Sequence, residues 1–533
     1  MRAAIPPVPL FGTSHDDFLQ VRIANRILDG QWLGPWDGLI LSKGPGYPLV
    51  LAGTSAVGVP PVMLQQVLYL IGALLLSVAL GRLWAGPWLT RAVFIVLALN
   101  PAMLGFSASR VYREGLVAGL ALLAIGLAAS VLAYRGDRRA EVWRLAGLLI
   151  GLGLVLGVLR IIRADTVWIL VAVIGVLAVY PWAAGRDWAP RWWAAVAVVT
   201  VAGGACLLAL LPERIVAGVN DARYGVPLAE DFTQGSLASA WRAWVRVEPH
   251  SDDPRAPLSA AQVAAGYSVS PTAARLAIDT DPAEADNSVT ALTVPGSYAV
   301  WAMRDRAAIA GARSADQMQA FFADVTAELT AACADGRLTC SGTPIAAGMP
   351  IIQTWDVAGI LRVARADVSE KWLAMAVAYP VAEVSERAPE YIGRLPGGTF
   401  PLDEGAEFTL WQRAVVGVQS PAGVLPPADA PVMRLQATLT SAYSLAWRIV
   451  WIPALIGLLL ALVLPGRRVV AAVGVMLIAG MAVSVGILSA YSWHGGGWAT
   501  YHYYLGSLPL ALTVTVLGCF GAGSLIRQAV RRR

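Results

Sequence analysis

Acidic and basic side chains gather where the polar start of the chain meets its first long apolar segments. This stretch carries the adjacent carboxylates Asp16 and Asp17, and it ends at Lys43 in a Lys-Gly-Pro-Gly-Tyr-Pro-Leu turn. A carboxylate can act as a general base toward an acceptor hydroxyl, or can bind a divalent metal such as Mg or Mn. Arg and Lys bind phosphate groups, Arg in a bidentate way, so cations beside these acids suit a lipid-phosphate headgroup.

Later short loops add further ionisable residues, which the topology below assigns to the same face: Arg110, Arg113, Glu114, Arg160, Arg163 and His502. Such residues near apolar segments are costly to hold and usually face a cavity or each other. For any one of them, a solvated local ion pair, such as Arg113 with Glu114, explains the residue equally well. The recurrence of carboxylates and guanidinium groups in separate loops favours one shared site.

The composition is that of a polytopic membrane protein. The 533 residues are 57% hydrophobic and only 14% charged, with a mean hydropathy of +0.60. A soluble protein of this length could not cover its surface with so few charges. The net charge of +5 comes largely from Arg near the ends of apolar segments, and no basic stripe alternates with aromatic residues. The positive charge is therefore explained by the orientation of the helices in the membrane, and no nucleic-acid partner is expected.

Apolar segments long enough, or nearly long enough, to cross a membrane predict an all-α bundle of about nine transmembrane helices. They lie at about 62–82, 91–106, 114–133, 143–160, 166–182, 190–212, 446–466, 468–491 and 500–525. The middles of these segments carry almost no charge. This argues against a transporter, whose proton or ion relay would place carboxylates in mid-helix.

Arg residues in alternate loops predict the orientation in the cell inner (plasma) membrane. By the positive-inside rule the following residues are cytoplasmic, and with them the C-terminus: Arg82, Arg91, Arg135, Arg138, Arg139, Arg144, Arg186, Arg191, Arg467, Arg468, Arg527 and Arg531 to Arg533. The start of the chain then lies outside without a signal peptide or a preceding helix. Either the first helix inserts with its amino end outward, or the sequence as given lacks one upstream helix, and we favour the second alternative.

Changes in composition predict four units: an outer first loop with the acidic motif (1–60), core membrane helices (61–212), an extracytoplasmic α+β domain (213–445) and C-terminal membrane helices (446–533). The clearest element of the α+β domain starts at Ser314, presents an apolar face at helical spacing and stops at Gly336. Cys333 then lies on its last turn, and a disulfide to Cys340 is expected outside the cytoplasm.

Several segments resemble the C-type (GT-C superfamily) integral-membrane glycosyltransferases, nearest to the branch of the protein O-mannosyltransferases and lipid A aminoarabinose transferases. The first outer loop carries the resemblance in residues 14–18, 24–32 and 43–49, which give an acidic residue, an Ala-x-x-Ile-Leu-x-Gly-x-Trp helix and the Lys-Gly-Pro-Gly-Tyr-Pro-Leu turn. It continues through residues 99–101, 107–114 and 157–160. It thus covers about residues 14–180.

This resemblance implies transfer of a sugar from a polyprenyl-phosphate donor to an acceptor hydroxyl at the extracytoplasmic face. The acceptor would be a glycan, lipid or protein, and membrane lipids surround the bundle. It makes Asp16 or Asp17 the catalytic carboxylate and Glu114 the acid of the second loop. The residues expected to contact the donor phosphate are Lys43, Arg110, Arg113, Arg160, Arg163 and His502.

A second reading of the chain is not enzymatic. The bundle would then be a scaffold that has lost catalysis, and the extracytoplasmic domain would be the working part of a membrane-anchored binding or assembly protein. A polyprenyl-phosphate pocket distinguishes the two readings, because a scaffold without a donor pocket should bind no such lipid.

Overall fold

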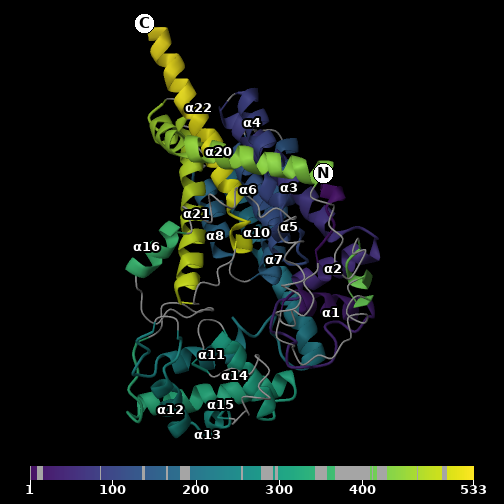
Figure 1. Ribbon diagram of the computed structural model, residues 1–533, viewed down its shortest axis with the longest axis vertical. Coiled ribbons are helices and arrows are strands. Elements are labelled where there is room, and N and C mark those ends of the chain that lie inside the picture. Colours follow the sequence, from purple (N-terminus) through teal and green to yellow (C-terminus); the bar gives the residue numbers. More distant parts are fainter. Residues whose placement is uncertain are drawn as a thin grey trace.

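The computed structural model of the chain describes residues 2–8, 16–84, 86–134, 139–163, 166–179, 192–253, 256–277, 292–293, 298–342, 357–366, 409–410, 412–416, 429–464, 466–494 and 501–532. These residues form a helical bundle with a group of shorter helices at one end, opposite the end where the C-terminus lies (Figure 1). No β-sheet occurs among the described residues, in which only two isolated β-bridges pair extended backbone.

Each of the nine predicted apolar segments corresponds to a helix, so the predicted polytopic all-α bundle is confirmed. The helices are α3 (Pro61–Trp84), α4 (Pro87–Ala98), α6 (Glu114–Leu132), α7 (Arg139–Ile162), α8 (Val167–Ala178), α10 (Trp192–Tyr224), α20 (Pro431–Ala461), α21 (Arg468–His494) and α22 (Leu508–Arg532). Eight described spans are long and apolar enough to cross a membrane, and α8 is shorter. The chain is a multi-pass membrane protein.

Two of the predicted boundaries fall inside helices. The α10 helix runs on to Tyr224, through the boundary expected at 212, and α20 starts at Pro431 instead of near 446. Both extensions are more polar than the segments they prolong, so an apolar pattern alone does not reveal them.

Helix α6 lies at the centre of the bundle. Almost every one of its residues is buried, and it packs along α3, α7 and α8. Small residues allow the close approach to α3: a Cβ atom on Gly72 would lie 2.5 Å from the backbone nitrogen of Leu123. Such small-residue contacts let membrane helices pack closely without a hydrophobic driving force. The tight packing fixes Glu114, the first residue of α6.

Before the bundle, the chain folds into two helices that carry the acidic motif and the turn. Helix α1 (Asp17–Leu28) starts at the acidic pair, and α2 (Gly46–Ala56) starts within the turn that follows Lys43. The two helices pack against each other. Short elements between α4 and α6, namely η2 (Pro101–Leu104) and α5 (Phe106–Ser109), bring Arg110 beside the start of α1.

We call helices α11 to α15 the inserted domain. They are α11 (Gly235–Val245), α12 (Ala260–Val269), α13 (Pro271–Ala274), α14 (Tyr298–Ile309) and α15 (Ala315–Ala334). They share a core of their own, which includes Trp241, Trp244, Met303 and Phe322. Figure 1 shows them together below the bundle.

The described part of the inserted domain differs from the α+β expectation. It is helical, and its extended pairing is limited to the bridge between Val247 and Cys340. The Pro and Gly residues in this region suggested short strands separated by turns. In the structure Ser259 and Ser270 instead cap the helices α12 and α13. Residues 254–255, 278–291, 294–297, 343–356, 367–408, 411 and 417–428 of the predicted domain lie outside the described residues.

Helix α15 matches its sequence pattern in extent. It follows Ser314, buries its apolar face and stops before Gly336, whose φ of +77° suits glycine. At the start of the helix the Ser314 hydroxyl donates to Asp316, and the Gln317 amide oxygen accepts from the Arg313 N–H. Cys333 and Cys340 are joined by a disulfide, with their Cα atoms 5.7 Å apart.

Candidate active site

The two neighbouring acids have different surroundings because they start a helix. Asp16 precedes α1 and Asp17 is its first residue, so their side chains leave the backbone in different directions. Asp17 is fully buried, whereas 43% of the Asp16 side chain is exposed. Of the pair, Asp16 is therefore the carboxylate that a substrate can reach.

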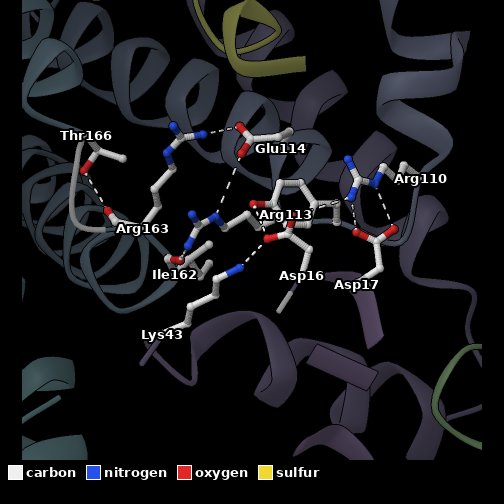
Figure 2. Close-up of polar contacts among 10 residues, drawn as sticks. Asp16, Asp17, Lys43, Arg110, Arg113, Glu114, Ile162, Arg163 and Thr166 are labelled. Atoms are coloured by element: carbon white, nitrogen blue, oxygen red, sulfur yellow. Dashed lines mark hydrogen bonds and ion pairs between the residues drawn. The ribbon is translucent and has the colours of Figure 1, made fainter. Parts of the chain in front are cut away.

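Asp17 is held by Arg110 through two contacts. Its Oδ1 atom lies 2.6 Å from Arg110 Nη2, and its Oδ2 atom accepts from Arg110 Nε at 2.8 Å. This bidentate geometry, visible in Figure 2, is the strong form of the Arg–carboxylate pair. It ties the start of α1 to the chain between α5 and α6, so Asp17 and Arg110 position the loop around them.

Asp16 faces a set of hydrogen-bond donors. Its Oδ1 atom pairs with the Lys43 ammonium group and accepts from the Tyr112 hydroxyl at 3.3 Å. Its Oδ2 atom lies 3.9 Å from Arg110 Nη2. The Tyr112 ring also lies against three cations, since its centroid is 4.6 Å from Arg110 Cζ, 5.6 Å from Arg113 Cζ and 5.8 Å from Lys43 Nζ. Aromatic faces attract such cations.

These surroundings push the two carboxyl pKa values apart. Burial alone would raise the pKa of Asp16, but the charges of Lys43 and Arg110 lower it well below its usual range. For Asp17 burial dominates over the attraction of Arg110 and raises the pKa to about 6. Separation of two carboxyl pKa values by their environments is typical of acid–base sites.

The turn that carries Lys43 rests on the end of α7. A Cβ atom on Gly44 would lie 2.3 Å from the carbonyl oxygen of Ile161, and one on Gly46 would lie 2.7 Å from the carbonyl carbon. Real Cβ contacts are longer, so glycine is required for this approach. The turn thereby places Lys43 close to the chain segment that carries Arg163.

A second group of charges surrounds Glu114. Its carboxylate pairs with Arg163, and its Oε1 atom lies 3.9 Å from Arg113 Nε. Arg113 also donates to the carbonyl oxygen of Ile162 at 3.4 Å. Figure 2 shows the two groups side by side, with Arg113 between Glu114 and Asp16. Glu114 is the first residue of α6, where the helix dipole further stabilises its ionised carboxylate.

A small recess of about 10 Å³, with room for about one water molecule, lies beside the Glu114–Arg163 pair. Its apolar wall includes Val117, Trp168 and Leu488. Its polar lining includes Tyr503 and Ser484, and the buried Ser484 hydroxyl has no hydrogen-bond partner among the described residues. The recess thus joins a charged end to an apolar wall.

Most of the predicted site residues lie together, Arg160 does not, and the prediction for His502 is not tested. The two adjoining groups described above contain seven of the predicted residues: Asp16, Asp17, Lys43, Arg110, Arg113, Glu114 and Arg163. Arg160 instead pairs with Glu213 at the surface, where its side chain is 52% exposed. His502 lies in η4 (Tyr501–Tyr504), and its side chain is outside the described residues.

Sequence reasoning missed three residues of this site. The Tyr503 ring lies 4.9 Å from Arg163 Cζ, and Trp301 of the inserted domain lies 5.9 Å from Lys43 Nζ. Glu230, between α10 and α11, interacts with the charge of Arg113, and burial raises its pKa to about 7. For Tyr503 the Tyr-His-Tyr-Tyr cluster was a signal, but no local pattern marks Trp301 or Glu230.

No group of three or more His, Cys, Asp or Glu residues converges as a metal site in the part of the chain that the structure describes. Asp16 and Asp17 each face cations, and that setting does not suit a second cation. A site for Mg or Mn stays a prediction, and no step of the reaction proposed below depends on one.

Comparisons with known proteins give little further guidance. No protein-family model matches the chain, and no curated protein sequence matches it. A crystal structure of ArnT from Cupriavidus metallidurans in the apo state aligns with 98% of this chain and 75% of its own, at 14% identity and a TM-score of 0.32. At that TM-score the likeness carries no weight for the site.

Proposed function

We propose that the chain is a membrane glycosyltransferase that moves a sugar from a polyprenyl-phosphate donor to an acceptor hydroxyl at the extracytoplasmic face. One observation carries the proposal: a partly exposed carboxylate, Asp16, pairs with Lys43, and the charge of Arg113 also acts on it. A base for the acceptor and cations for the leaving phosphate are the two chemical needs of this transfer.

The reaction follows from the placement of these groups. The acceptor oxygen attacks the anomeric carbon, and its proton passes to Asp16. The bond between that carbon and the phosphate oxygen breaks, and the polyprenyl phosphate leaves with the electron pair. Attack from the face opposite the phosphate inverts the anomeric configuration. Lys43 and Arg113 neutralise the charge that develops on the leaving phosphate, which is where most of the rate enhancement should arise.

Donor binding would also tune the base. In the structure Lys43 pairs with Asp16 and lowers its pKa, which makes Asp16 a weak base. A lipid phosphate that draws the Lys43 ammonium group toward itself would raise that pKa and strengthen the base. The site would therefore favour proton transfer only when the donor is present.

We place the lipid beside Glu114 and Arg163, where the apolar side chains that line the small recess would meet the first isoprene units and Arg163 and Tyr503 lie at the polar end. The recess would have to widen when the lipid binds, since it has room for about one water molecule. Asp17 and Arg110 are positioning residues in this scheme, because both are buried against each other. The inserted domain would select the acceptor glycan, lipid or protein.

The test uses the full chain in lipid nanodiscs and a C55 polyprenyl monophosphate as the probe. We expect saturable binding that Lys43→Met and Arg163→Met weaken about tenfold or more, since each removes a charge-assisted contact. With a polyprenyl-phosphate sugar as donor, Asp16→Asn should abolish lipid-phosphate release while binding persists. Binding that is not saturable, or that is unchanged in Lys43→Met, would overturn the proposal. Saturable binding without turnover would favour the non-catalytic reading.

A further inference from the structure

Helix α14 of the inserted domain reaches the loop that ends at Lys43. Two of its residues, one helical turn apart, make the contacts. The Trp301 ring centroid lies 5.9 Å from Lys43 Nζ, and Arg304 Nη2 donates to the carbonyl oxygen of Ile40 at 2.5 Å. The spacing of three residues places both side chains on one face of α14. Helix α14 thus contacts this loop at two points, the Lys43 side chain and the Ile40 backbone.

Arg304 is anchored before it reaches the loop. It is fully buried, and its Nε and Nη2 atoms lie 2.9 Å and 2.8 Å from Asp231 Oδ2. The backbone N–H of Asp231 donates to the carbonyl oxygen of Leu41 at 2.8 Å. The paired residues therefore hold two successive carbonyl groups of the loop, those of Ile40 and Leu41.

The held segment has an unfavourable backbone conformation. Leu41 has a φ of +68°, in the left-handed region that side chains with a Cβ atom avoid. A residue keeps such a conformation only when its surroundings determine it. The contacts from Arg304 and Asp231 constrain this point, two residues before Lys43, together with the local turn in which Ser42 donates to the carbonyl oxygen of Leu39.

A second aromatic residue contacts Trp301. Its ring packs on Phe232 at a centroid distance of 4.4 Å. On another side of Lys43, the Tyr112 ring lies 5.8 Å from Nζ. The ammonium group thus lies near one aromatic ring from the membrane bundle and one from the inserted domain.

We propose that Trp301 and Arg304 are positioning residues through which the inserted domain sets the affinity of Lys43 for the donor phosphate. This inference rests on the proposed function, because it takes Lys43 as a phosphate ligand. A lysine side chain has many rotamers, and fixing it beforehand reduces the entropy lost when phosphate binds. A domain that engages an acceptor could, by shifting α14, alter donor affinity at the same site.

The experiment measures the affinity for C55 polyprenyl monophosphate of full-length variants in nanodiscs, together with amide hydrogen exchange. Trp301→Leu removes the aromatic face, and Trp301→Phe keeps one. Arg304→Lys keeps the charge beside Asp231 but loses the fork that reaches Ile40. We expect Trp301→Leu and Arg304→Lys to weaken binding about three- to tenfold, with Trp301→Phe close to wild type. Exchange should rise in residues 37–43 for Arg304→Lys.

Arg306→Lys is the matched control. Arg306 is a buried residue of the same helix that donates to the carbonyl oxygen of Leu276 at 2.8 Å, within the inserted domain. We expect this variant to bind the lipid phosphate as wild type does. Equal weakening in Arg306→Lys would attribute the effect to general loosening of the domain and overturn the inference.

Lys43→Met separates the two proposals. If Lys43→Met loses lipid-phosphate binding while Trp301→Leu and Arg304→Lys bind as wild type, the inference fails and the proposed function stands. If Lys43→Met also binds as wild type, the proposed function fails, and the inference fails with it.

Discussion

Replacement of Gly44 by alanine tests the contact that places Lys43. The added Cβ atom would lie 2.3 Å from the carbonyl oxygen of Ile161 and 3.2 Å from its carbonyl carbon. These are backbone atoms at the end of α7, so no flexible side chain can move aside. Overpacking of this kind costs about 1–3 kcal/mol. Alanine also lowers the conformational entropy of the unfolded chain, which stabilises the fold by about 0.4–1 kcal/mol. The net loss in the free energy of unfolding is then about 1–2 kcal/mol.

Gly53→Ala is the matched control for this change. Gly53 lies inside α2, and a Cβ atom there would meet nothing within 4 Å. Alanine is favoured over glycine inside a helix by about 0.5–1 kcal/mol. The two Gly→Ala changes, nine positions apart, should therefore have opposite signs and differ by about 2 kcal/mol in the free energy of unfolding.

The assay is unfolding of both variants in one detergent, with lipid-phosphate binding measured on the same samples. We expect Gly44→Ala to unfold before wild type and to bind polyprenyl monophosphate more weakly, because the turn moves away from α7 and carries Lys43 with it. Gly53→Ala should unfold after wild type and bind normally. If Gly44→Ala is as stable as Gly53→Ala, the turn does not rest on α7 and the reasoning is wrong.

Three further predictions concern single side chains. Asp16→Asn should lower turnover about 10²–10⁴-fold. It should change the free energy of unfolding by less than about 1 kcal/mol, because 43% of the Asp16 side chain is exposed; equal losses of turnover and stability would contradict this prediction. Burial raises the pKa of Glu230 from 4.5 to about 7, so the folded chain holds a proton that the unfolded chain releases, and stability falls as pH rises between those values. The free energy of unfolding of Glu230→Gln, relative to wild type, should therefore rise by roughly 3 kcal/mol between pH 4.5 and 8. A difference between the two unfolding curves that does not change with pH would refute this. Cys340→Ser opens the disulfide to Cys333 and should lower the free energy of unfolding by about 2–3 kcal/mol for so short a loop, an effect that reducing agent should reproduce in wild type and not in the variant.

The helices were predictable because their signals are local. An apolar segment of spanning length must satisfy its backbone hydrogen bonds within itself, so each of the nine segments became a helix whatever its neighbours. In the same way Gly336, with its positive φ, marks the end of α15. The caps of α12 and α13 at Ser259 and Ser270 were equally local, but Pro and Gly nearby concealed them.

The division of roles between Asp16 and Asp17 could not be predicted from the sequence. Both residues start α1, and no periodic pattern separates two neighbours at a helix end. Their difference comes from segments far along the chain: Arg110 encloses Asp17, and Lys43 approaches Asp16 from the turn before α2. Only the packed arrangement makes one carboxylate buried and leaves the other accessible.

Long-range pairing also changes what the site must do when a ligand arrives. The sequence offers Arg113 as the local partner of Glu114, yet the closer partner is Arg163, which follows α7. Lys43 likewise faces the carboxylate of Asp16. The cations that we assign to the phosphate thus already face acidic groups, so a lipid phosphate exchanges one anion for another. Such an exchange keeps each cation paired in both states, and it would release Asp16 as a base at the moment the donor binds.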